Sequence, residues 1–191
     1  APSADEKLKA EAMTLDEIRE SRDCFIEAAR RAERTGFDGV ELHAAHGYLI
    51  CSFMSPELNR RDDEYGGDPE RRARFLFEIV DGVRAATKPG FTLGVRLSPE
   101  RWGLDMLEIR DVAQRLLREA RIDFLDMSLW DVRKEPEETE FRGRSLLSYF
   151  TALERGMVRL GAAGKVMGGE DARCVLEAGA DLAIIGRPPI A

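Results

Sequence analysis

The chain has 191 residues, of which 43% are hydrophobic and 34% charged, and a formal net charge of −7. This length and balance are those of a globular domain with one sizeable core, and they exclude a disordered or fibrous protein. The acidic charge argues against nucleic acid or an anionic membrane as a partner, but a local basic pocket for a small anion stays compatible with it.

Cysteine usage and hydropathy narrow the class further. The three cysteines, Cys24, Cys51 and Cys174, are widely spaced and form no Cys-x-x-Cys pair. Their number is odd, so the sequence predicts neither a disulfide framework nor a zinc or iron–sulfur site. Residues 1–7 lack the apolar core of a signal peptide, and no window approaches the roughly 18 apolar residues of a membrane span. We expect a cytoplasmic protein that binds neither a membrane nor a metal.

The first predicted element is a helix that begins after Thr14, because Thr14-Leu15-Asp16-Glu17 has the form of a capping box. Apolar and small residues follow at helical spacing up to Gly36, where the helix should stop. Val40 and Leu42 then place the backbone in a short strand. That strand runs into three hydrogen-bonding side chains: His43, His46 and Tyr48.

Helices and strands continue to alternate along the chain. The pattern predicts helices over 69–87, 108–119, 146–160 and 171–177, and strands over 92–97, 122–127, 165–167 and 182–185. Nearly all-apolar strands, each separated from the next by a helix, are typical of a parallel sheet covered by helices. The charged, turn-rich insertion over 52–68 should be an ordered loop. We therefore predict an α/β fold and a single domain over 1–191.

Two architectures accommodate five such strands: an open doubly wound sheet and part of an eight-stranded barrel. The barrel is favoured because each strand delivers polar side chains or glycines at its carboxyl end, which would gather at one rim. These are His43, His46 and Tyr48, then Arg96 and Ser98, then Ser128, Trp130 and Asp131, then Gly168 and Gly169, and finally Gly186 and Arg187. Loops after the last two barrel strands frequently bind phosphate, which suits the last two pairs. We expect a partial (β/α)8 TIM barrel, strands 4 to 8, with the first three strands absent.

Several motifs carry a family resemblance. The run 37–49 is followed by Asp63-Glu64-Tyr65-Gly66-Gly67, Val95-Arg96-Leu97-Ser98, Asp126-Met127-Ser128 and Gly186-Arg187-Pro188. Together they resemble the Old Yellow Enzyme family of FMN-dependent oxidoreductases. The resemblance implies the C-terminal portion of an FMN-binding barrel. NADH or NADPH would reduce the bound FMN. It also implies an activated alkene as substrate, with hydride passing from flavin N5 to its C=C bond.

The resemblance also implies roles for the residues at the predicted rim. His43 and His46 would donate hydrogen bonds to the activating oxygen of the substrate, where charge develops as hydride arrives. Tyr48 would supply the proton, which suits a phenol with a pKa near 10. Arg96 would lie against the N1 and C2 carbonyl side of the flavin. The FMN phosphate would be held by four residues: Gly168, Gly169, Gly186 and Arg187.

Other interpretations stay open. The histidine pair could bind a metal or satisfy buried polar groups, but no third and fourth ligand follow at metal spacing. From the residues alone, Arg96 fits a core ion pair as well as a cofactor role. A dienoyl-CoA reductase-like relative would share the scaffold, but such relatives usually carry an iron–sulfur cysteine cluster that this chain lacks. Glu170 would disfavour a phosphate beside it unless its carboxylate points to solvent.

A rival of another class is a non-catalytic half-barrel fragment that needs a missing N-terminal part or a partner chain. Nothing before Met13 can supply the first three strands of the barrel. Open edges on strands 4 and 8, with the apolar lining between them, would then favour self-association.

Overall fold

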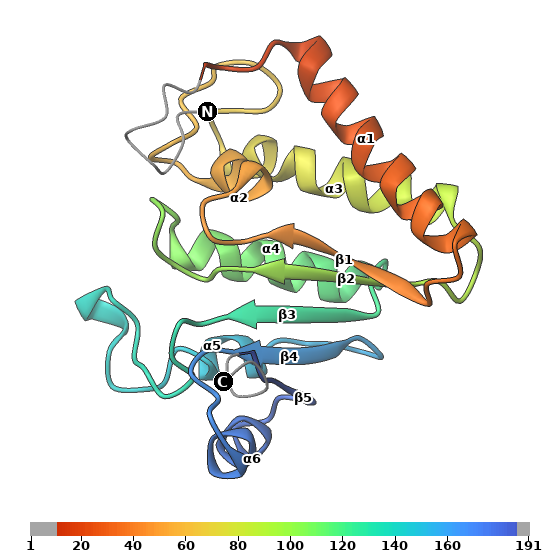
Figure 1. The fold of residues 1–191 in the computed structure, drawn as a ribbon. Coiled ribbons are helices and arrows are strands. Elements are labelled where there is room, and N and C mark those ends of the chain that lie inside the picture. Colours follow the sequence, from red (N-terminus) through yellow and green to blue (C-terminus); the bar gives the residue numbers. More distant parts are fainter. Residues whose placement is uncertain (1–10, 187–191) are drawn as a thin grey trace.

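The structure is a computed structural model that describes residues 11–186. Five parallel strands form one sheet in the order β1-β2-β3-β4-β5, and their arrows point the same way in Figure 1. The strands are β1 (Gly39–Ala44), β2 (Thr92–Leu97), β3 (Phe124–Ser128), β4 (Arg159–Ala163) and β5 (Leu182–Ile184). The α/β class with a parallel sheet is confirmed.

Six α-helices and one 3-10 turn accompany these strands in the described residues. They are α1 (Leu15–Arg34), α2 (Leu49–Met54), α3 (Pro69–Ala86), α4 (Met106–Glu119), η1 (Thr139–Phe141), α5 (Ser148–Thr151) and α6 (Gly169–Glu177). None of the helices in this part of the chain combines the length and the apolar character needed to cross a bilayer.

The predicted capping box starts α1. The Thr14 hydroxyl accepts a hydrogen bond from the backbone amide of Glu17 at 3.2 Å, and the Glu17 carboxylate accepts one from the amide of Thr14 at 2.7 Å. Two of the amides that a helix start leaves without partners are thereby satisfied. α3 begins similarly, with Pro69 in its first position and the Asp68 carboxylate accepting from the amide of Arg71.

Two neighbouring predicted elements are wrong. The helix expected over 146–160 is a single turn, α5, and the strand expected over 165–167 lies earlier, as β4. Apolar residues at 146, 147, 150 and 153 mimic helical spacing, but Gly156 has φ 54° and the chain then becomes extended. Residues 164 and 165 have φ values of 144° and 48°, which a strand does not tolerate. The small residues of β4, Gly161 to Ala163, hide its strand character in the sequence.

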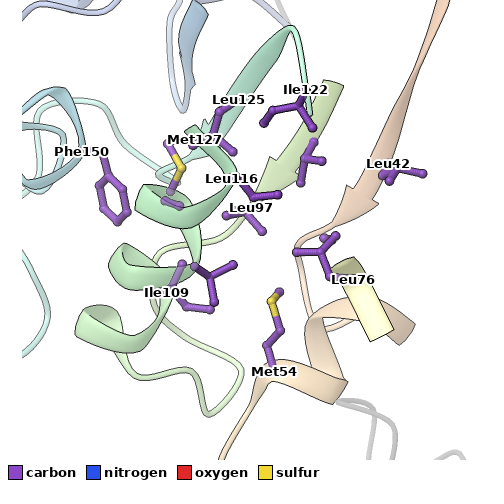
Figure 2. Packing of buried hydrophobic residues seen from close by; sticks show 14 of the residues in the cluster. Leu42, Met54, Leu76, Leu97, Ile109, Leu116, Ile122, Leu125, Met127 and Phe150 are labelled. Atoms are coloured by element: carbon purple, nitrogen blue, oxygen red, sulfur yellow. The ribbon is translucent and has the colours of Figure 1, made fainter. Parts of the chain in front are cut away.

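The core lies between the sheet and its helices. Leu42, Val95 and Leu125 project from one face of the sheet and are buried. Figure 2 shows Ile109 and Leu116 of α4 beside the strand residues, and both are almost fully buried. Because strand side chains alternate between faces, the opposite face carries the remaining positions. That second face holds the polar residues of the sheet.

The insertion between β1 and α3 is ordered, as expected. The buried Asn59 side chain donates hydrogen bonds to the carbonyls of Phe53 and Tyr65 at 2.6 and 2.7 Å. The buried Arg72 of α3 donates to the Gly67 carbonyl and to Glu108 of α4. These polar contacts fix the loop against the helices without a strand or a long helix of its own.

At the amino ends of the strands, aspartates bridge neighbouring strands. Asp123, just before β3, accepts a hydrogen bond from the amide of Leu93 in β2 at 2.8 Å and another from Arg84 of α3. Asp181, just before β5, does the same with the amide of Leu160 in β4 and with Arg155, both at 2.8 Å. We call these two contacts the aspartate bridges. They fix the sheet at the amino ends of its strands, opposite the predicted rim.

We expect Asp123→Ala to lower the free energy of unfolding by about 1–2 kcal/mol, because Leu93 and Arg84 lose a charged acceptor that is itself half exposed. Burial alone would raise the pKa of Asp123, but the bonds from Arg84 and the Leu93 amide outweigh it and lower that pKa. The stabilisation that the Asp123 carboxylate provides is therefore present above the unfolded pKa of about 3.9 and is lost as the pH falls through the folded pKa.

Urea unfolding at several pH values measures the effect of Asp123→Ala. Asp111→Ala, at an exposed position of α4, is the matched control and should change stability by less than about 0.5 kcal/mol. Equal loss in both variants, or a loss that does not change with pH, would contradict the bridge.

Candidate active site

Three rings gather at the carboxyl end of β1. The centroid of the His43 ring lies 5.0 Å from that of His46 and 5.2 Å from that of Tyr48, so the sequence-predicted trio is brought together. His46 has φ 60°, a left-handed conformation that is uncommon for a residue with a side chain, and Gly47 follows at φ 74°. This sharp turn lets the chain leave the strand and enter α2, where Tyr48 is the N-cap residue.

Neighbouring elements hold His46 in that conformation. Its backbone amide donates to the buried Ser98 hydroxyl at 3.0 Å, just beyond β2. Its ring packs edge-on against Trp102, with centroids 5.5 Å apart, and Nε2 lies 2.7 Å from the Ser128 hydroxyl at the end of β3. Contacts from two further strand ends therefore fix the backbone and the ring of this one histidine.

The parallel register places charges beside this trio. His43 pairs with Arg96 across β1 and β2, and Arg96 pairs with Asp126 across β2 and β3. Arg96 Nε lies 3.2 Å from a carboxylate oxygen of Asp126, whose side chain is 2% exposed. Arg96 Nη2 also reaches the Ser128 hydroxyl at 3.4 Å. The core ion pair and the rim position of Arg96 are thus both observed.

Hydrogen bonding around this pair is incomplete. Arg96 Nε and Asp126 Oδ1 are buried, and neither has a hydrogen-bond partner among residues 11–186. Desolvation raises the pKa of Asp126, and Arg96 only partly opposes it. The pKa of Glu41, two residues before His43, is raised by desolvation and then by Asp126. Arg96 is therefore the cation that two carboxylates share.

The same environment keeps the imidazoles neutral. Burial lowers the pKa of His43, and the Arg96 cation lowers it further. For His46 the causes are burial, then Arg96, then His43. Neutral imidazoles at pH 7 donate hydrogen bonds without carrying charge. Cys51, close by in α2, takes no part, because burial raises the pKa of its thiol to about 11.

A cavity of about 570 Å³ opens beside these residues. Its lining runs from Arg96 and Ser128 past Trp130 to the loop after β4 and the end of β5. The lining residues beyond β3 are Ala163, Gly164, Lys165, Val166, Met167, Ile184, Ile185 and Gly186. Ser128 and Trp130 also line the small cavity that contains His46. His46 and the large cavity therefore share a wall, which Ser128 and Trp130 form.

Gly164 fixes that wall. A Cβ at Gly164 would lie 2.8 Å from backbone atoms of Trp130 and Asp131, and its φ of 144° also disfavours a side chain. The amide of Val132 donates to the Gly164 carbonyl at 3.1 Å. The loops after β3 and β4 thus lie backbone against backbone, and Trp130 is held at φ 66° between the two cavities.

The predicted phosphate residues are only partly grouped. Gly186 lines the large cavity, while Gly168 is the N-cap of α6 and Gly169 its first residue. A Cβ at either α6 glycine would meet no atom within 4 Å. Glu170 is exposed, as a nearby anion would require. Arg187 lies outside the described residues.

Sequence reasoning missed the polar row behind the rim. In the sequence, Asp126 is named only as part of a motif and Ser128 is predicted at the rim without a partner, and Glu41 and Trp102 are not considered. A signal was available for three of them, because Glu41, Asp126 and Ser128 are polar residues at alternate positions of apolar strands. Alternation puts them on the face that carries Arg96. The ring contact of Trp102 depends on a loop that no periodicity describes.

The sequence of the chain is similar to those of known proteins. Residues 2–191 match the model of the NADH:flavin oxidoreductase / NADH oxidase family. The probable NADH-dependent flavin oxidoreductase YqiG of Bacillus subtilis (strain 168) is 38% identical over 185 residues, 93% of this chain and 50% of that protein. An NADPH dehydrogenase of Geobacillus thermodenitrificans (strain NG80-2) is 38% identical over 178 residues, 92% of this chain and 52% of its own.

Solved structures agree. Morphinone reductase in complex with tetrahydroNAD has a TM-score of 0.76 and 34% identity, covering 95% of this chain and 48% of that one. The Old Yellow Enzyme homologue from Zymomonas mobilis has a TM-score of 0.77 and 33% identity, covering 94% and 50%. The chain spans about half the length of the curated relatives it matches. Its five-stranded sheet is accordingly part of a (β/α)8 barrel, as predicted.

We expect Arg96→Leu to lower the free energy of unfolding by about 2–4 kcal/mol, because it leaves the buried Asp126 carboxylate without its cation. Without Arg96, desolvation raises the pKa of Asp126 unopposed. A carboxyl whose folded pKa exceeds its unfolded pKa destabilises the fold when the pH is above the unfolded pKa. Well below that pH the carboxyl is protonated in both states and the destabilisation disappears. The deficit should therefore shrink as pH falls toward about 4.

Urea unfolding of three variants measures this effect. Arg118→Leu makes the same chemical change on the exposed face of α4 and should be nearly neutral. The double variant Arg96→Leu/Asp126→Leu should regain most of the loss, because no buried charge remains. A single and a double variant of equal stability would contradict the ion pair's role.

Proposed function

Since the chain belongs to the NADH:flavin oxidoreductase / NADH oxidase family, we propose that it binds FMN and uses NADH or NADPH to reduce a C=C bond conjugated to an electron-withdrawing group. The observation that carries the proposal is the ring trio His43, His46 and Tyr48 beside the cavity that Arg96 lines. The chain spans half of its relatives, so the activity is proposed for the protein to which these residues belong.

The residues present fit a flavin. The volume of the large cavity is within the roughly 300–1,000 Å³ typical of small-molecule sites. Arg96 lines it. Its Nε is buried 3.2 Å from an Asp126 carboxylate oxygen and lacks a hydrogen-bond partner among residues 11–186. A guanidinium suits the electron-rich N1 and C2 carbonyl side of a flavin ring. Gly186, and Gly168 and Gly169 at the start of α6, suit a phosphate because bare backbone amides attract anions. Bound FMN would supply the hydride chemistry.

The chain's own residues would act on the substrate oxygen and on the proton. His43 and His46 are neutral at pH 7 and would donate to the oxygen that gains charge. Their positions are set by the strand and by the Ser98 and Ser128 contacts, so little reorganisation is needed when charge develops. Tyr48 is 63% exposed at the rim, where its phenol can deliver a proton to the α-carbon of a bound alkene.

Cofactor binding is tested first. FMN is added in excess to the purified chain, unbound flavin is removed by gel filtration, and the visible absorption spectrum is recorded. We expect retained flavin absorbance, loss of most of it in Arg96→Lys, and no loss in Arg118→Lys on the exposed face of α4. A colourless protein would contradict FMN binding by this chain and favour the non-catalytic interpretation.

The proton donor is tested by separating the two half-reactions. Tyr48→Phe should leave flavin reduction by NADH or NADPH nearly unchanged and slow alkene reduction about 10²- to 10⁴-fold, since a positioned general acid contributes that much. Stopped-flow absorbance of the flavin follows both steps. Tyr149→Phe, whose hydroxyl bonds the Phe141 carbonyl, is the control and should change neither. Equal slowing of both steps would disprove the role of Tyr48.

Self-association is a second part of the proposal. In the described part of the chain, β1 and β5 each pair with a strand on one side only. Unpaired strand edges are templates for pairing with another chain. Leu182, the first residue of β5, and Ile185, which follows the strand, are also more than 40% exposed. We propose that these edges are where a second chain would pair.

A further inference from the structure

Ser128 occupies a position between the two cavities. Its hydroxyl is 2.7 Å from Nε2 of His46 and 3.4 Å from Nη2 of Arg96. The residue is 9% exposed. Within residues 11–186, these are the two hydrogen-bond partners of the Ser128 hydroxyl. One hydroxyl therefore joins Arg96, which lines the large cavity, to His46, a member of the ring trio.

The chemistry of the two partners decides where the hydroxyl proton lies. A guanidinium only donates hydrogen bonds, so Ser128 Oγ accepts from Arg96. A hydroxyl carries one proton, and the remaining partner that can accept it is Nε2 of His46. In the opposite arrangement, Arg96 and a protonated Nε2 would both donate to Oγ, and the hydroxyl proton would have no acceptor among residues 11–186.

The His46 ring carries a single proton, which makes its location meaningful. Burial, Arg96 and His43 all lower the pKa of His46, so the imidazole is neutral at pH 7. In a neutral imidazole, one ring nitrogen donates and the other accepts. The hydrogen bond made at one nitrogen selects the tautomer.

We propose that Ser128 is a positioning residue that holds His46 as the Nδ1–H tautomer, so that Nδ1 is the ring's free hydrogen-bond donor. The ring cannot exchange the two nitrogens without losing Ser128, because the His46 amide is tied to Ser98 and the ring packs against Trp102. Resting on the proposed function, the consequence is that the substrate oxygen meets Nδ1–H of His46. Arg96 contributes by fixing the direction of the Ser128 hydroxyl.

The tautomer is measured directly by NMR on the chain labelled with 15N-histidine, without added flavin. The sequence contains two histidines, so two imidazoles give signals, and a His43→Gln sample assigns them. Long-range 1H–15N correlations at pH 8 show which nitrogen carries the proton. We expect a protonated Nδ1 and a bare Nε2 for His46. A protonated Nε2 would overturn the proposal.

Variants test whether Ser128 is the cause. Ser128→Ala should convert the His46 signals to the other tautomer or to a mixture, and Ser128→Thr, which keeps a hydroxyl, should preserve the wild-type pattern. Ser148→Ala removes a comparable hydroxyl contact, to the Ser145 carbonyl, far along the chain and should leave His46 unchanged. An unchanged tautomer in folded Ser128→Ala would overturn the role of Ser128. If Ser128→Ala does not fold, the wild-type and Ser128→Thr spectra still test the proposal, because a protonated Nε2 of His46 in either one would overturn it.

The outcome is independent of the proposed function. Flavin retention is read from visible absorbance and the tautomer from the flavin-free chain, so either can fail alone. A protonated Nε2 in a chain that retains FMN would refute only the Ser128 inference. A protonated Nδ1 in a chain that stays colourless would support it and refute only FMN binding.

Discussion

Strand register is the constraint on which the site depends. Parallel pairing sets His43 level with Arg96 and Arg96 level with Asp126, across three strands from distant parts of the chain. A shift of one residue would turn each of these side chains toward the helices, where the apolar core leaves no room for charge. The packing of Leu42, Val95 and Leu125 against the helices therefore determines where the polar row lies.

Within that row, charge is arranged around a single arginine. Glu41 and Asp126 both have raised pKa values, and the Arg96 cation partly opposes this rise. The same cation lowers the pKa of the two imidazoles. Arg96 therefore links the carboxylates below the rim to the neutral donors on it. Removing Arg96 would raise the pKa of all four groups, so the site behaves as one electrostatic unit.

Much of this arrangement could be predicted from the sequence, for identifiable reasons. The capping box at Thr14 and the apolar strand over 92–97 carry local signals, and both are found where the pattern puts them. The trio at the end of β1 lies within six residues, so local geometry suffices to group it. β4 could not be placed, because glycine and alanine carry little strand preference and the turn at residue 164 depends on contact with Trp130. The Arg96–Asp126 contact needs the register of strands that are far apart in sequence.

The aspartate bridges fix one end of the sheet, so the two ends differ in how much sequence change they tolerate. Asp123 and Asp181 secure the amino ends of the strands through backbone amides, while the rings and cavities occupy the carboxyl ends. Loops at the rim can therefore diverge in length and sequence while the strand order persists. In directed evolution, libraries confined to the rim loops would vary the cavity lining on an unaltered scaffold, and reinforcing mutations at the amino ends of the strands could be added beforehand without touching the ring trio.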